Sequence, residues 1–148
     1  MSCGCTNPQK VHAAVITPVL AAGSVASPYF VQVNISQRLC RKACVNLPPV
    51  FNPVFSLVDY AAVGTGQYVA TVKVEGIIAY TPCDTNGCCD KTQVLSQDFT
   101  VPFASATAPT SVTVTAGTTV NAISAGPCQN CSRNFVSETP LTLTVATA

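Results

Sequence analysis

Residues 68–80, Tyr-Val-Ala-Thr-Val-Lys-Val-Glu-Gly-Ile-Ile-Ala-Tyr, predict a β-strand more clearly than any other stretch of the chain. Successive side chains of a strand point to opposite faces, so a strand beside a core alternates in polarity with a period of two. One face here carries Tyr68, Ala70, Val72 and Val74, and the other carries Val69, Thr71, Lys73 and Glu75. Gly76 interrupts the alternation and predicts a bulge or a change of face.

The same period recurs on both sides of this strand, in segments bounded by Gly, Pro and Asn. Further strands are predicted at 11–20, 29–39, 55–60, 92–103, 109–116, 118–123 and 141–145. Their expected inward residues include Tyr29, Val31, Val33, Ile35, Leu39, Leu95, Phe99, Val101, Phe103, Leu141, Leu143 and Val145. Seven or eight strands without a helix predict an all-β chain, with one β-sandwich domain over 11–148 that is jelly-roll-like.

The segment before the first predicted strand has a different character. Residues 1–10, Met-Ser-Cys-Gly-Cys-Thr-Asn-Pro-Gln-Lys, contain nothing that builds a core, and Gly4, Asn7 and Pro8 disfavour a helix. Cys3 and Cys5 lie one residue apart in this segment. We therefore expect a flexible connector arm that attaches the domain to something else.

Nine cysteines fall into groups, and every group lies in the arm or in a predicted loop: Cys3 and Cys5; Cys40 and Cys44; Cys83, Cys88 and Cys89; Cys128 and Cys131. An odd number cannot all pair within one chain, so at least one is free, metal-bound or bonded to another chain. Disulfides are the favoured chemistry, within loops and between chains. Zinc is the alternative cofactor, held by Cys128 and Cys131 together with Cys40 and Cys44, or with Cys83 and Cys88.

Charge is scarce, at 9% of residues with a net charge of +1. A surface with so little self-repulsion favours association between copies. Seven scattered Lys and Arg residues do not suit a row of phosphates, so nucleic acid is not an expected partner. We recognise neither a membrane-spanning segment nor a secretory signal peptide. The expected location is extracellular or on a cell surface, after release that does not use Sec-type export.

Enzymatic activity is not expected. His12 is the only histidine, and the carboxylates are scattered along the sequence at Asp59, Glu75, Asp84, Asp90, Asp98 and Glu138. The sequence contains no phosphate-binding glycine loop and no Gly-x-Ser-x-Gly motif. No residue is therefore predicted to be catalytic.

These features favour a structural subunit that assembles with copies of itself into a fibre, appendage or coat. Cys3 and Cys5 would form disulfides with loop cysteines of a neighbouring subunit, and Cys88, Cys89, Cys128 and Cys131 are the leading acceptors. The alternatives are a phage decoration or tail protein on a similar sandwich, and a zinc-binding β module.

The cysteine-bearing arm, with Cys3 and Cys5, and the C-terminal strands rich in Val and Thr resemble the endospore appendage subunits of spore-forming Bacillus-type bacteria. The resemblance implies jelly-roll subunits that stack into pili on the spore surface. It also implies that connector cysteines form disulfides with preceding subunits. Such subunits are made in the mother cell without secretion and meet an oxidant later, which accounts for disulfides without a signal peptide.

Overall fold

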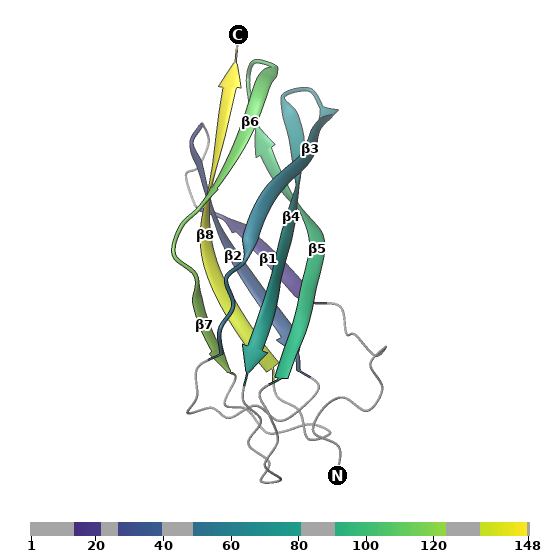
Figure 1. Ribbon diagram of the computed structural model, residues 1–148. Helices are drawn as coiled ribbons and strands as arrows, with labels where there is room; N and C mark the ends of the chain where they lie inside the picture. Colours follow the sequence, from purple (N-terminus) through teal and green to yellow (C-terminus); the bar gives the residue numbers. More distant parts are fainter. Residues whose placement is uncertain (1–13, 22–26, 40–48, 81–90, 124–133, 148) are drawn as a thin grey trace, which may run out of the picture.

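The structure, a computed structural model, describes residues 14–21, 27–39, 49–80, 91–123 and 134–147 (Figure 1). Within these residues the chain forms strands and no helix, which confirms the predicted all-β class. The strands are β1 (Val15–Leu20), β2 (Tyr29–Arg38), β3 (Val54–Gly64), β4 (Gln67–Tyr80), β5 (Lys91–Ala104), β6 (Pro109–Ala116), β7 (Val120–Ile123) and β8 (Asn134–Thr147).

Two antiparallel sheets lie face to face as a β-sandwich, as predicted. The larger sheet has the order β1-β2-β8-β6, and β7 pairs with β8 on the same side as β6. The smaller sheet has the order β3-β4-β5. Figure 1 shows the strands running along the length of an elongated body. The jelly-roll connectivity and the arm at 1–10 remain predictions.

The core fills the space between the two sheets, and the predicted inward faces are confirmed. Buried apolar residues include Val31, Val33 and Ile35 of β2, Val72 and Val74 of β4, Leu95, Val101 and Phe103 of β5, and Leu141, Leu143 and Val145 of β8. Gln37 continues the inward face of β2 and is also buried. The alternation of apolar and polar residues therefore identified which side of each strand meets the other sheet.

Gly76 produces neither a bulge nor a change of face, so that prediction is wrong. β4 pairs with β5 in one unbroken register from Gln67 to Tyr80, and Val74 and Ile78 are both buried. Glycine is needed for space, because a Cβ at Gly76 would lie 2.5 Å from Cε1 of Phe51. The Phe51 ring occupies the inward position that a side chain at Gly76 would otherwise take.

β8 begins several residues earlier than the predicted 141–145, although Pro140 lies within it. The two polar backbone groups of one residue in an antiparallel ladder point toward the same neighbouring strand. The Pro140 carbonyl accepts a hydrogen bond from the Gly117 amide at 2.8 Å, between the stretches of β8 that pair with β7 and with β6. The missing N–H of proline therefore faces a gap between two partner strands, where no ladder bond is lost.

Side-chain amides join the two sheets along both edges of the sandwich. On one edge β1 lies beside β5, and the Gln97 side chain donates to the Ala14 carbonyl at 2.8 Å and accepts from the Ala14 amide at 3.1 Å. On the other edge the Asn121 amide group donates to the Phe51 carbonyl at 3.1 Å. Phe51 also contacts Phe135 edge-to-face, with ring centroids 5.3 Å apart.

Candidate functional site

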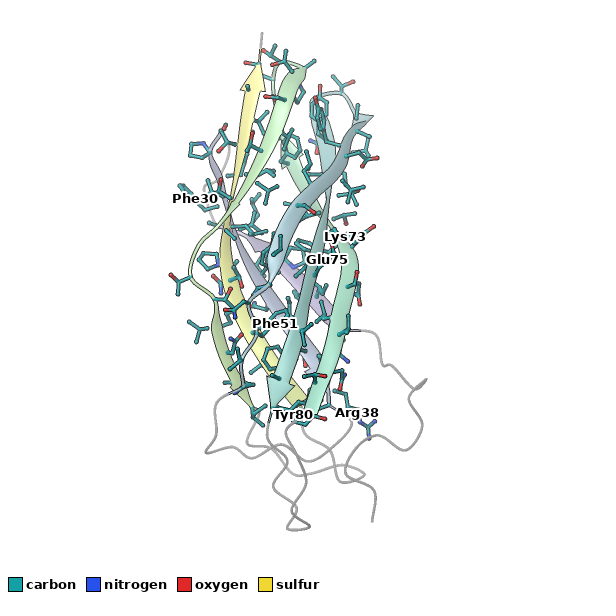
Figure 2. The ribbon with its side chains drawn as sticks, viewed as in Figure 1. Phe30, Arg38, Phe51, Lys73, Glu75 and Tyr80 are labelled. Atoms are coloured by element: carbon teal, nitrogen blue, oxygen red, sulfur yellow. The ribbon has the colours of Figure 1, made fainter. Side chains whose placement is uncertain are left out.

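The strand ends that border the cysteine-bearing segments lie together at one end of the sandwich. Arg38, the last residue of β2, pairs with Asn134, the first of β8. At the same end, Tyr80 of β4 pairs with Lys91 of β5, and Ile123 of β7 pairs with Phe135. β1 also begins near this end, because Val15 pairs with Ser36. Figure 2 shows Arg38 and Tyr80 both at this end of the sandwich.

All nine cysteines lie outside the described residues, in 1–13, 40–48, 81–90 and 124–133. Several of them are only two or three residues from a described strand end. Cys40 is two residues from Arg38, Cys89 is two residues from Lys91, and Cys131 is three residues from Asn134. Three residues span at most about 11 Å. The described residues to which these three cysteines are tethered therefore lie at the same end of the domain, which sequence spacing alone did not indicate.

The carboxylates are less scattered in space than in sequence. Glu75 and Asp98 both lie next to Lys73 on the outer face of the smaller sheet, because Asp98 pairs with Lys73 across β4 and β5. Nζ of Lys73 is 3.9 Å from Oε1 of Glu75, and the two side chains are 40% and 55% exposed (Figure 2). An exposed pair of this kind contributes about 0–1 kcal/mol, so it matters more for surface charge than for stability.

Beside this charged group lies an exposed apolar surface that the sequence analysis did not predict. We define the outer patch as Val50, Val54, Ile77 and Val94, all large apolar side chains that are more than half exposed. Ile77 pairs directly with Val94, while Val54 and Val50 pair with its neighbours Glu75 and Ala79. A hollow of about 480 Å³ lies over Val54, Ile77 and Val94. The signal was the continued alternation through Gly76, which places Ile77 outward.

The remaining candidate residues from the sequence are those considered for zinc binding or catalysis. The described residues contain no group of three or more His, Cys, Asp and Glu side chains able to hold a metal ion. The cysteines of the zinc alternative, His12, Asp84 and Asp90 all lie outside the described ranges. The expected lack of catalysis stays a prediction. In the described part of the chain, no helix is long and apolar enough to cross a membrane.

Comparison with known proteins leaves the fold and these surfaces as the basis for inference. No family model, curated protein or solved structure matches the chain.

Proposed function

We propose that the protein is a structural subunit that assembles with copies of itself into an extracellular fibre or appendage. Disulfides from Cys3 and Cys5 of the N-terminal arm cross-link neighbouring subunits in this proposal. The acceptors are drawn from Cys40, Cys44, Cys83, Cys88, Cys89, Cys128 and Cys131. The proposed subunit has a jelly-roll-like domain, is released without a Sec signal, and lies on a spore or cell surface, as the resemblance to endospore appendage subunits implies.

The observation that carries the proposal is the common end of the domain at which all four cysteine-bearing segments join the described strands. Cysteines tethered to one end are suited to joining that end to a neighbouring molecule. Exposed apolar side chains on the outer face of the smaller sheet, Ile77 and Val94 among them, add support. Large exposed apolar surfaces mark interaction sites on soluble domains.

One described pair also favours the zinc-binding alternative. Arg38 and Asn134 are direct cross-strand partners, so the segments with Cys40 and Cys131 start from adjacent points. In this proposal the short segments bring Cys40 and Cys131 together, either as ligands of one Zn²⁺ ion or as the two halves of a disulfide. A phage decoration or tail protein is the remaining alternative, and it differs from a fibre in forming a closed or capsid-bound assembly.

The test is denaturing gel electrophoresis of native material whose free thiols have been alkylated, with and without reductant. We expect a ladder or gel-excluded material that collapses to the 15.3 kDa chain only on reduction. Replacing both arm cysteines (Cys3→Ser with Cys5→Ser) should abolish the ladder. The matched control, Ser2→Ala with Thr6→Ala, changes the same arm without removing a thiol and should keep the ladder.

A single monomer band in both lanes would contradict cross-linked assembly. Stoichiometric zinc in native mass spectrometry, with thiols that alkylate only after a chelator is added, would favour the zinc-binding module instead. Electron microscopy of the cross-linked material separates an open filament from a closed ring.

A further inference from the structure

The outer patch, which is apolar, lies beside a group of charged side chains in which negative charge exceeds positive charge. Ile77 and Val94 are 57% and 64% exposed and face each other across β4 and β5. Next to them, Lys73 lies beside Glu75 (Figure 2) and is the cross-strand partner of Asp98 on the same face. Two carboxylates beside one cation leave this face with a residual negative charge. A ligand that fits here therefore presents apolar side chains and a positive charge.

The opposite face of the sandwich lacks this combination. Exposed apolar residues also occur there, at Val15, Val19 and Val120. Its described charges, Arg38 and Glu138, are one of each sign. A cationic apolar ligand is consequently drawn to the smaller sheet by charge as well as by burial.

The positive charge that would match the outer patch lies in the segments outside the described residues. The described residues carry three basic and four acidic side chains, whereas the whole chain has a net charge of +1. Residues 1–13 contain Lys10 followed by Val11, and no carboxylate side chain. Residues 81–90 carry Asp84 and Asp90, so they have the wrong sign.

Residues 124–133 carry one cation, Arg133, directly before β8, and no large apolar side chain. One other segment has both kinds of side chain, with Arg41, Lys42 and Leu47 in residues 40–48. It is held on both sides, however, by buried Leu39 and by the backbone hydrogen bonds between Val50 and Ala79 at 2.9 Å. Residues 1–13 join the described chain only at Ala14. They are therefore the better candidate for contact with another molecule.

We propose that the outer patch of one subunit is the docking surface for residues 1–13 of a second copy, with Lys10 placed against Glu75 and Asp98. This inference rests on the proposed self-assembly and names the surface that receives the arm before any disulfide forms. The Ala14 backbone is hydrogen-bonded to the Gln97 side chain. The four residues from Lys10 to Ala14 span at most about 14 Å. The edge between β1 and β5 of one copy must then lie close to the smaller sheet of the next.

Such a contact joins two different surfaces and is therefore heterologous. Heterologous contacts form rings when the rotation between copies closes, and open helical filaments when it does not. Docking by the arm thus gives polymerisation a direction, since each copy offers an arm to one neighbour and a patch to another.

The first test is zero-length carbodiimide cross-linking of the assembled full chain, kept reduced so that disulfides do not contribute. This reagent joins an amine to a carboxylate only when the two groups are in contact. The assembly is made from a mixture of ¹⁴N- and ¹⁵N-labelled chains. We expect mixed-isotope peptides that join Lys10 to Glu75 or Asp98. Same-isotope peptides alone, or links from Lys42 in place of Lys10, would overturn the proposal.

The second test compares surface variants by sedimentation under the same reducing conditions. Replacing the patch pair (Ile77→Asn with Val94→Thr) should weaken assembly about tenfold or more, because each side chain loses most of its apolar burial. Lys10→Gln lies outside the fold and should weaken assembly about two- to fivefold, as expected for one partly exposed ion pair. The controls are Val15→Thr with Val120→Asn on the larger sheet, and Lys42→Gln.

The outcomes separate this inference from the function on which it rests. If the unmodified chain does not assemble and forms no reducible ladder, the proposed function fails. If it assembles normally, and both the patch pair and Lys10→Gln behave like their controls, only the docking surface is wrong. Circular dichroism of the patch variant checks that the exposed substitutions leave the fold intact.

Discussion

Where β1 lies beside β5, the sandwich is closed by an amide that uses both of its polar atoms, as Gln97 binds the backbone N–H and C=O of Ala14. On the opposite edge, closure depends on aromatic packing between Phe51 and Phe135, and on one hydrogen bond from Asn121. The second amide is only half used, because the side-chain oxygen of Asn121 is buried without a partner among the described residues.

The difference shows two ways of ending a sheet edge without adding another strand. A glutamine on a neighbouring sheet imitates the ladder partner that an edge strand lacks, since a carboxamide carries the same donor and acceptor as a peptide group. An aromatic ring excludes water from an edge instead. The Gln97 edge also anchors Ala14, the point at which the proposed arm joins the domain.

The largest effect is expected at the aromatic edge. Phe51 is only 1% exposed and contacts both Phe135 and the backbone at Gly76. Phe51→Ala should lower the free energy of unfolding by about 3–5 kcal/mol, because it removes a large buried side chain and leaves a cavity. Urea unfolding of the reduced chain measures this loss.

The matched control is Phe30→Ala, since Phe30 is 54% exposed and its loss should cost far less. Gly76→Ala sharpens the comparison. It should cost about 1–3 kcal/mol in the normal chain through overpacking against Phe51. The same change should cost much less in the Phe51→Ala background. Equal costs in the two backgrounds would show that the ring does not occupy the space over Gly76.

A smaller effect is expected at the polar edge. Gln97→Ala leaves the N–H and C=O of Ala14 without partners at a residue that is almost fully buried. We expect a loss of about 1–3 kcal/mol in the free energy of unfolding, and faster hydrogen exchange at the Ala14 amide. Gln97→Asn should behave similarly, because the shorter side chain does not reach both backbone atoms.

Gln32→Ala is the control for this edge, because Gln32 bonds to Glu138 at 3.3 Å on the exposed face. Its effect should stay within about 0.5 kcal/mol, as for most surface substitutions. If Gln97→Ala and Gln32→Ala destabilise the protein equally, the hydrogen bonds between Gln97 and Ala14 do not close the edge.

These contrasts also explain how far the sequence predicts the fold. The strands and most inward faces follow from period-two alternation, which is local and is clear in β2, β4, β5, β7 and β8. Register shifts interrupt it in β3 and at the start of β6. The prediction at Gly76 was wrong because the glycine leaves space for the ring of Phe51, a residue that is not adjacent in sequence. The role of Gln97 depends on a contact 83 residues away, at Ala14. Polar residues inside a sheet register carry no local sign of such a partner.

The candidate site, too, was only partly predictable from the sequence. Grouped cysteines are visible in the sequence, but their tethering at one end requires the pairing of Arg38 with Asn134 and of Tyr80 with Lys91. The outer patch likewise depends on the register that sets Ile77 against Val94. A sequence gives the alternation of each strand, whereas the alignment between strands depends on tertiary packing.

The smallest effect, and the one with the opposite sign, is expected beside the half-used amide. Ser137 is the cross-strand partner of Asn121, and its hydroxyl is buried with no hydrogen-bond partner in the described part of the chain. Ser137→Ala removes a group that loses water on folding and gains nothing in return, so stability should stay unchanged or rise by up to about 1 kcal/mol. Thr139→Val is the contrast two residues along β8, since the Thr139 hydroxyl lies 2.8 Å from that of Thr119. It should cost about 0.5–1.5 kcal/mol. A clear loss of stability for Ser137→Ala in urea unfolding would show that this edge satisfies its polar groups after all, and the contrast with Gln97 would then disappear.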